Sequence, residues 1–129
     1  GDYGRNLNFW DVSQGIKLPS IVDVHSSTKG IKSLVLTSDS KYVLTGSSDF
    51  SIVMSDIAQQ KSVYRFEGAH TTTVYSLSIS SDSKYLFSGA QGKDIAIWDL
   101  EKRKLLHRFA DVCDGEVRSL RVSHDDKYL

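Results

Sequence analysis

The chain has 129 residues, and its 16 lysine and arginine side chains are matched by 16 aspartates and glutamates, so its formal net charge at pH 7 is zero. That balance provides no overall attraction to nucleic acid or to an anionic membrane. No apolar run approaches the roughly 20 residues of a membrane-spanning helix, and a single cysteine cannot form an intrachain disulfide. We therefore expect a soluble intracellular domain, cytoplasmic or nuclear, that does not insert into membranes.

A five-residue motif recurs along the chain at a fixed spacing. Residues 38–42 and 81–85 both read Ser-Asp-Ser-Lys-Tyr, and residues 124–128 read His-Asp-Asp-Lys-Tyr, so that successive copies lie 43 residues apart. A period of this length is typical of solenoids, propellers and arrays, in which one unit stacks on copies of itself to bury its apolar face. The sequence therefore predicts a tandem repeat of about three periods.

Each period contains the same series of short predicted strands. In chain order they cover residues 7–11, 18–21, 31–36, 44–46, 52–56, 63–66, 74–79, 87–89, 95–99, 106–109 and 117–122. Apolar residues such as Ile52 and Met54 alternate with smaller or more polar ones, which is the period of a strand. Turns rich in serine and aspartate separate the strands, and the short intervals favour antiparallel hairpins with four strands per unit. Pro19 indicates that the last strand of a unit lies at a sheet edge.

The first strand of each unit has an irregular apolar spacing. Ile31, Leu34 and Leu36 are separated by a step of three residues and then by a step of two, and the same steps recur from Val74 and from Val117. A regular strand returns to one face only at even steps, so the repeated odd step predicts a β-bulge at the same place in every unit.

A Trp-Asp pair closes the third predicted strand in two units, as Trp10-Asp11 and Trp98-Asp99, while Ser55-Asp56 keeps only the second member. A Gly-x-His sequence ending at His70 precedes one of the first strands. With four strands in a period of about 43 residues, the whole chain resembles the WD-repeat β-propeller family. The resemblance implies an all-β fold, namely a propeller segment made of four-stranded antiparallel blades.

The resemblance also implies a hydrogen-bonded network in each blade. In the family it joins a His before the first strand, a Ser or Thr ending the second, an Asp in the next turn and the Trp of the third strand. The corresponding residues of the two full units are His25, Thr45 and Asp49, followed by His70, Ser88 and Trp98. The first unit has Ser55 in place of the Trp, and the second has Gly92 in place of the Asp. Because such a network rigidifies only when it is complete, we expect neither blade to be as rigid as a consensus repeat.

The repeat divides the chain into two complete and two partial blades. The expected units are residues 1–24 with a third and fourth strand, 25–67 and 68–110 as complete blades, and 111–129 with a first strand and the start of a second. Propellers close with about four to eight blades, so we expect a fragment of one larger propeller domain. The alternative is a chain of three periods that completes its propeller by oligomerisation.

The residue types that act in catalysis or metal binding do not form the sequence pattern of an enzyme, a metal site or a cofactor site. Gly-x-Ser-x-Gly and the phosphate-binding Gly-x-x-x-x-Gly-Lys are absent, and the aspartates recur with the structural period. Cys113 has no His or Asn placed near it by the repeat register, so we interpret it as a small semi-buried residue and not as a nucleophile. The four histidines lack zinc-ligand spacing. We therefore expect no catalytic residue, bound metal or cofactor.

The resemblance places partner contacts in the loops before each first strand and between the second and third strands. The positions carried over are Thr28, Ser48, Thr71, Thr73, Gln91, Asp114 and Glu116. They include no Trp or Arg anchor of the kind that dominates binding hot spots. The implied function is a non-catalytic scaffold that assembles proteins through this surface. The alternative is a reader of a basic or modified peptide tail in the propeller channel, suggested by the acidic Asp114 and Glu116.

Two groups of basic residues are positioned in the sequence so that they could contact the phosphates of a nucleic acid. Arg118 and Arg121 share one predicted first strand, and Lys102, Arg103 and Lys104 share a hairpin turn. A charged hairpin tip is usually a solvated surface, and the neutral chain provides no general pull toward phosphate. We therefore expect proteins or peptides as partners, and neither nucleic acid nor a small-molecule substrate.

Overall fold

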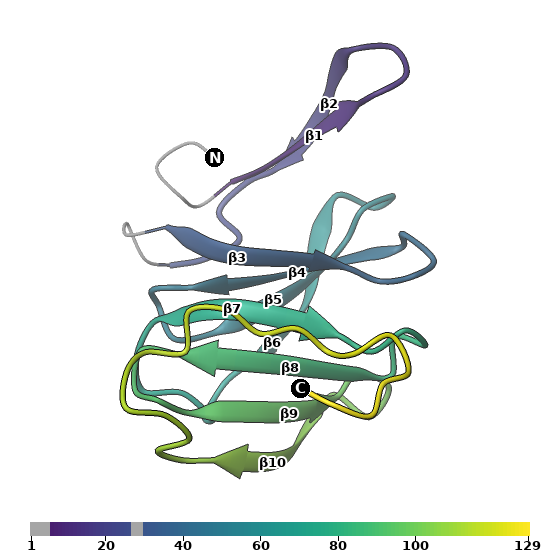
Figure 1. Cartoon of the computed structure of the whole chain (residues 1–129). Helices are drawn as coiled ribbons and strands as arrows, with labels where there is room; N and C mark the ends of the chain where they lie inside the picture. The colour runs from purple at the N-terminus through teal and green to yellow at the C-terminus, as the bar shows by residue number, and fades with distance from the viewer. Residues whose placement is uncertain (1–5, 27–29) are drawn as a thin grey trace.

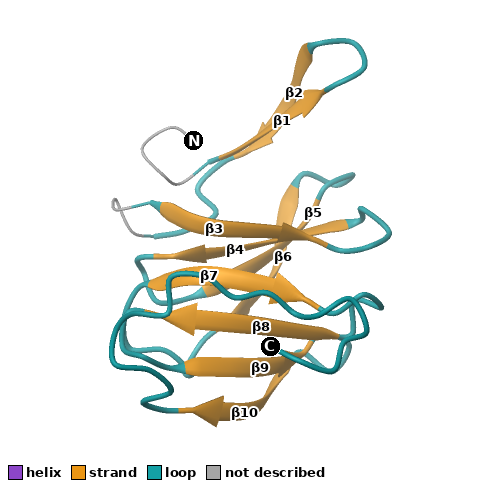
Figure 2. Cartoon of the chain, viewed as in Figure 1, coloured by secondary structure: helices purple, strands orange, loops and turns teal. Residues whose placement is uncertain are grey.

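The computed structural model describes residues 6–26 and 30–129. These residues form ten strands in three antiparallel sheets, and no helix occurs among them. The sheets follow one another along the chain, from the purple N-terminal hairpin to the green C-terminal half (Figure 1). Loops and turns make up the other described segments (Figure 2). The all-β, antiparallel fold predicted from the repeat is therefore confirmed.

The first sheet is a hairpin of two strands, β1 (Leu7–Asp11) and β2 (Ile16–Ile21), at one end of the molecule (Figure 1). Gly15 closes its turn with a φ of 65°, and the Gly15 amide donates to the carbonyl of Asp11 at 2.7 Å. Pro19 lies in β2, which is an edge strand of this sheet. The position predicted for the only proline is therefore confirmed.

Two four-stranded sheets follow, and in each of them strands adjacent in sequence pair with one another. The second sheet contains β3 (Ile31–Leu36), β4 (Tyr42–Ser47), β5 (Ile52–Asp56) and β6 (Lys61–Phe66). The third sheet contains β7 (Val74–Ile79), β8 (Tyr85–Ala90), β9 (Ile95–Asp99) and β10 (Lys104–Phe109). All neighbouring strands pair antiparallel. The outer strands β2, β6 and β10 begin two residues earlier than the sequence predicted, and so do the second strands β4 and β8.

The repeated five-residue motif forms the turn between the first and second strands. The Asp39 carboxylate accepts a hydrogen bond from Thr37 Oγ1 at 2.6 Å and another from the Lys41 amide at 2.9 Å. Asp82 and Asp125 accept the same pair of bonds in the next two copies. These aspartates therefore hold turns, which is the role that the sequence predicted for them.

A register shift interrupts the ladder between the first and second strands of both four-stranded sheets. In β3 it falls between Ile31 and Ser33, and in β7 it falls at the equivalent place. The residues left without a cross-strand partner are Lys32 and Tyr75. The bulge predicted from the odd apolar step is therefore confirmed in both sheets.

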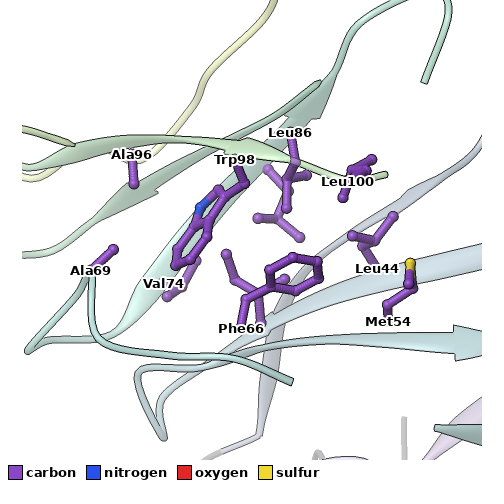
Figure 3. Close-up of a cluster of buried hydrophobic side chains, with 11 residues drawn as sticks. Leu44, Met54, Phe66, Ala69, Val74, Leu86, Ala96, Trp98 and Leu100 are labelled. Atoms are coloured by element: carbon purple, nitrogen blue, oxygen red, sulfur yellow. The ribbon is translucent and has the colours of Figure 1, made fainter. Parts of the chain in front are cut away.

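The main core lies between the two four-stranded sheets. Its buried side chains are Leu44, Ile52, Met54, Phe66, Ala69, Val74, Leu77, Leu86, Ala96, Trp98 and Leu100. Phe66 of β6 and Trp98 of β9 pack edge to face with their ring centroids 5.4 Å apart, and both rings lie in the middle of the cluster in Figure 3. Each sheet thus buries an apolar face that it could not bury alone.

A smaller core lies between the first sheet and the second. Leu7, Ile21 and Val24 are buried there together with Val43 of β4 and Val53 of β5. Neighbouring residues of β4 and β5 belong to the main core, and successive side chains of a strand point to opposite faces. The middle strands of the second sheet are therefore buried on both faces.

Glycine recurs near the end of each second strand because two sheets approach closely there. A side chain at Gly46 in β4 would place its Cβ 2.7 Å from Val74 Cγ1 in β7. Gly89 in β8 is packed in the same way against Val117. The 43-residue recurrence of glycine thus reflects the contact between neighbouring sheets.

The C-terminal segment differs from the prediction, because residues 117–122 do not form a strand. The Val117 amide donates to the Ala90 carbonyl at 3.1 Å, and the Val122 amide donates to Ser78 Oγ at 3.1 Å. These bonds hold the segment against β7 and the end of β8 (Figure 1). Among the described residues it has no second strand beside it, and a ladder needs such a partner. The segment therefore lies where a first strand would stack, without a strand's hydrogen bonds.

Candidate functional site

Two sets of loops meet at one end of the four-stranded sheets. In the second sheet the Ser48 amide donates to the Gly30 carbonyl at 3.3 Å, and in the third sheet the Gln91 amide donates to the Thr73 carbonyl at 2.9 Å. Backbone bonds therefore fix the loop between the second and third strands against the loop before the first strand. We call this surface the rim; its described residues are 22–26, 30, 48–51, 67–73, 91–94 and 110–116.

A polar cluster joins the rim of the third sheet to the C-terminal segment. Gln91 Nε2 donates to Glu116 Oε1 at 3.0 Å. Arg118 Nε donates to Glu116 Oε2 at 2.9 Å, and Arg118 Nη2 lies 2.8 Å from the same oxygen. Gln91 is exposed, whereas Thr73 and Glu116 are half-buried. The structure thus brings together three of the predicted contact residues, namely Thr73, Gln91 and Glu116.

The other predicted contact residues do not join this cluster. Ser48 is only 8% exposed, so its side chain offers little surface to a partner. Thr71 and Asp114 are exposed on their own loops. Thr28 lies outside the described residues.

A hydrogen-bonded network lies beneath the rim of the second sheet. Buried His25 has its Nε2 2.9 Å from Thr45 Oγ1 and its Nδ1 3.1 Å from both oxygens of Asp49. Asp49 also accepts from Ser51 Oγ at 2.7 Å and from Arg65 Nη1 at 3.2 Å. The structure therefore brings His25, Thr45 and Asp49 together, and it adds Ser51 and Arg65. Both additions were missing from the sequence-based set.

The charges in this network follow from its surroundings. Burial lowers the pKa of His25, although the Asp49 carboxylate opposes that shift. Burial acts to raise the pKa of Asp49, but hydrogen bonds from Ser51 and Ser26 outweigh it and hold that pKa well below its usual range. At pH 7 Asp49 is therefore ionised and His25 is neutral. The neutral ring donates from Nδ1 to the carboxylate, and its Nε2 accepts from the hydroxyl of Thr45.

The third sheet has an equivalent histidine in a different network. His70 Nε2 lies 2.7 Å from Ser88 Oγ, which also accepts from Trp98 Nε1 at 2.9 Å. Ser88 Oγ has two lone pairs and one hydrogen, so it can accept from Nε2 or donate to it, and the contact fits either tautomer of His70. His70 Nδ1 is buried and has no hydrogen-bond partner among the described residues. The reason is that Gly92 stands where the second sheet has Asp49.

Burial and the neighbouring charges set the pKa of His70. Burial lowers the pKa of His70 to about 4; the Asp94 carboxylate opposes the shift, and the Arg108 guanidinium adds to it. Asp94 is itself paired with Arg108, so it does not replace the missing acceptor. Leaving a buried polar nitrogen such as Nδ1 without a hydrogen-bond partner costs about 1–3 kcal/mol.

The arginine of each network was missed, although the repeat contains a signal for it. Arg65 in β6 and Arg108 in β10 lie 43 residues apart. Each contacts a buried carboxylate, Asp49 in one sheet and Asp94 in the other. Recurrence of a cation on an outer strand could have predicted a buried ion pair in each blade.

The bulge residues form a further row that the sequence analysis did not select. Lys32, Tyr75 and Arg118 occupy equivalent positions in three successive units. Lys32 and Arg118 are exposed, and Tyr75 is half-buried. The odd apolar step was the available signal, because a bulge residue lacks a cross-strand partner and its side chain is redirected.

Within the described residues, no group of three or more His, Cys, Asp or Glu side chains could hold a metal ion. Cys113 is exposed, and its thiol donates to the Gly115 carbonyl at 2.8 Å. The expectation that this cysteine is semi-buried is therefore wrong, because it lies on a surface loop.

The described residues contain no helix with the length and apolar character that crossing a bilayer requires.

The family model described as "WD domain, G-beta repeat" matches residues 17–56 and 60–99, which together make up more than half of the chain. The chain belongs to the WD40 repeat family. Each matched WD40 repeat contains most or all of the outer strand of one sheet and the three inner strands of the next. One repeat thus contributes to two blades, which links neighbouring blades covalently.

Two solved structures resemble this WD40 chain. One is described as "Crystal structure of RRP9 WD40 repeats", with a TM-score of 0.62 and 27% sequence identity. The other is described as "Structure of U3-55K", with a TM-score of 0.62 and 28% identity. Both alignments cover 67% of this chain and 28% of the other, so the chain spans little more than a quarter of the length of these proteins. The comparison with curated proteins found no match.

Proposed function

We propose that this WD40 segment is a non-catalytic scaffold that assembles protein complexes through its rim. The observation that supports this most directly is the cluster of exposed Gln91 with half-buried Thr73 and Glu116, on loops that are fixed by backbone bonds. Binding to a surface that is already ordered loses little conformational entropy. Loops on a rigid β-scaffold are also a common place for recognition.

The absence of catalysis is part of the proposal, and the surroundings of the polar groups support it. His25 is buried, the side chain of Asp49 is only 7% exposed, and the two are hydrogen-bonded to each other. His70 is buried against Ser88. Each of these groups has a structural role beneath the rim, where a substrate would have to displace packed residues to reach it.

We also propose that residues 25–67 and 68–110 are complete blades of a longer intracellular propeller, to which residues 1–24 and 111–129 contribute partial blades. Each of the two central ranges contains one four-stranded sheet, whereas the first range contains two strands. The greater length of the two similar structures agrees with this proposal.

A reader of a basic or modified peptide tail is the second candidate function. Asp114 favours it, because this aspartate is exposed and has no ion-pair partner in the part of the chain that the structure describes. Glu116 supports it less, because Arg118 and Gln91 already occupy its carboxylate. This candidate predicts salt-sensitive binding of basic peptides, and an unaltered affinity after Asp114→Lys combined with Glu116→Lys would exclude it.

The scaffold proposal is tested by adding two bulky cations to the rim. We expect Thr73→Arg combined with Gln91→Arg to abolish capture of partner proteins, because the new side chains occupy the cluster. The immobilised protein and its variants are compared by quantitative mass spectrometry of the captured proteins. The melting temperature, followed by circular dichroism, should remain unchanged.

The matched control carries the same two charges at the other end of β5. Gln59→Arg combined with Gln60→Arg changes an exposed hairpin, and Gln60 is equivalent to Arg103, which already adopts the same left-handed conformation. Capture should survive in this control. Capture that survives in the rim variant, or equal loss of capture in both variants, would show that the rim is not the binding surface.

A further inference from the structure

A groove of about 380 Å³ runs along the first strands of the sheets. It is lined by residues 33–35 of β3, 75–79 of β7 and 118–121 of the C-terminal segment. A second hollow of about 310 Å³ is lined by Tyr75 and Arg118. The groove therefore crosses three successive units on the side away from the outer strands β6 and β10.

The charge of this groove is positive. Its lining contains Arg118 and Arg121 and no carboxylate. Arg121 is exposed and has no acidic partner among the described residues, and Arg118 is paired only with Glu116 at the rim. Lys32, the residue of β3 equivalent to Arg118, is exposed and is also unpaired within the described chain. An anionic ligand would therefore meet the guanidinium of Arg121, which no described carboxylate pairs, and beside it the guanidinium of Arg118, which it would share with Glu116.

The groove also offers more hydrogen-bond donors than the protein uses. Ser33 Oγ accepts from the Leu77 amide at 2.9 Å, and Ser78 Oγ accepts from the Val122 amide at 3.1 Å. Neither hydroxyl donates to another described residue, and the hydroxyl of Tyr75 makes no hydrogen bond with any of them. A fitting ligand is therefore rich in acceptors, and a hydrogen bond to an ionised acceptor is stronger than one to a neutral acceptor.

We propose that this groove binds an acidic peptide segment of a partner protein, with Asp or Glu carboxylates paired to Arg118 and Arg121. The apolar side chains of Leu34, Val35 and Ile79 line the same groove and would contact the aliphatic parts of such a peptide. Nucleic acid fits less well, because its affinity depends on neutralising many phosphates and the chain has no net positive charge. The inference rests on the proposed scaffold function, because it specifies the chemistry of the partner.

The test measures binding of a short fluorescent peptide of alternating glutamate and serine to the 129-residue protein by fluorescence anisotropy. We expect saturable binding that weakens as salt is added, and no binding of the matched peptide with glutamine in place of glutamate. Arg118→Gln combined with Arg121→Gln should weaken binding about tenfold or more, since both charge-assisted contacts to the peptide carboxylates are lost. Tyr75→Phe should weaken it to a smaller extent.

The matched control is Lys102→Gln combined with Lys104→Gln, which removes the same charge at the exposed start of β10, far from the first strands. Its affinity should equal that of the unmodified protein. Equal weakening in both double variants would mean that only the net charge matters, and would overturn the proposal. Tighter binding of a single-stranded oligonucleotide than of the glutamate peptide would also overturn it.

The two proposals can fail separately. If the peptide does not bind while the rim variant still loses its partners, the acidic-segment inference is wrong and the scaffold proposal stands. If the peptide binds through the arginines while the rim variant retains its partners, the groove is a binding site and the rim is not.

Discussion

His25 and His70 occupy the same position in successive blades, yet their second ring nitrogens have different surroundings. His25 Nδ1 faces the carboxylate of Asp49, whereas His70 Nδ1 is buried without a partner among the described residues. Both rings are neutral at pH 7, because burial lowers the pKa of each. At the scale of single residues, the change from Asp to Gly at position 92 therefore removes the acceptor that would support the charged form of His70.

We predict that the protein loses stability as the pH falls from 6.5 toward 4. The pKa of His70 is about 4 in the folded state and 6.5 in the unfolded chain, so the unfolded state binds more protons in this interval. The contribution of neutral His70 to the free energy of unfolding is fully present above pH 6.5, and acidification to pH 4 should remove about 3 kcal/mol of it. The measurement is urea unfolding at a series of pH values, followed by circular dichroism.

Gly92→Asp supplies the missing acceptor and should reduce this acid sensitivity. A Cβ at this position would lie 3.1 Å from Thr72 Oγ1, which requires only a small adjustment. The new carboxylate would raise the pKa of His70, as Asp49 acts on that of His25. Gly92→Ala is the matched control, because it adds the same Cβ without an acceptor. An NMR titration in which His70 has the same pKa in both variants would contradict this account.

At the scale of elements, the bulge and the glycine of each unit set how neighbouring sheets meet. The register of β3 shifts between Ile31 and Ser33, and the hydroxyl of Ser33 then accepts the amide of Leu77 in the next sheet. Gly46 lies where β4 approaches Val74 of β7. Both features recur with the period because every blade must make the same contact with the one that follows it.

We predict that Gly46→Ala destabilises the protein by about 1–3 kcal/mol, since it overpacks the contact between sheets. The added Cβ would lie 2.7 Å from Val74 Cγ1 and 3.2 Å from Val74 Cβ. The free energy of unfolding is measured by denaturant titration. Gly115→Ala serves as the control and should be nearly neutral, because a Cβ there has no atom within 4 Å. Combining Gly46→Ala with Val74→Ala should recover part of the loss, and strictly additive losses would argue against the proposed clash.

At the scale of the whole molecule, the stack of sheets leaves apolar side chains exposed at both ends. The side chains of Trp10 and Leu34 are 62% and 52% exposed, and both line a hollow at the N-terminal end of the stack. The first sheet has only two strands, so it covers part of the four-stranded sheet beside it. Phe109 and Tyr128 are exposed toward the other end. Exposed apolar faces and open strand edges promote association.

We predict that the isolated 129-residue chain self-associates in a concentration-dependent manner. Trp10→Ser combined with Leu34→Ser should shift the distribution toward the monomer, as measured by sedimentation velocity. Val12→Ser is the control, because Val12 is exposed in the β1–β2 turn, outside the stacked faces. A strictly monomeric chain at high concentration would show that these faces do not drive association.

The fold could be predicted closely, and the candidate site only in part. Periodic residues such as Asp39 and Gly46 carried the signal for turns and sheet contacts, because every unit needs them. The strand expected at residues 117–122 was wrong: its apolar spacing is that of a first strand, but the described residues include no second strand beside it to form the ladder. The burial predicted for Cys113 was wrong, because the burial of a loop residue depends on packing and not on local spacing.

The sequence by itself determined the period, the strand order, the bulge and the family, since these depend on local spacing and are repeated with each unit. Only the tertiary structure decided which polar residues meet. It joined Gln91 to Glu116, paired Arg65 with Asp49, and brought Arg118 and Arg121 to a groove shared with Tyr75. The physical reason is that these contacts cross between strands or units, so they depend on stacking and on the direction of each side chain, which spacing along one chain does not specify.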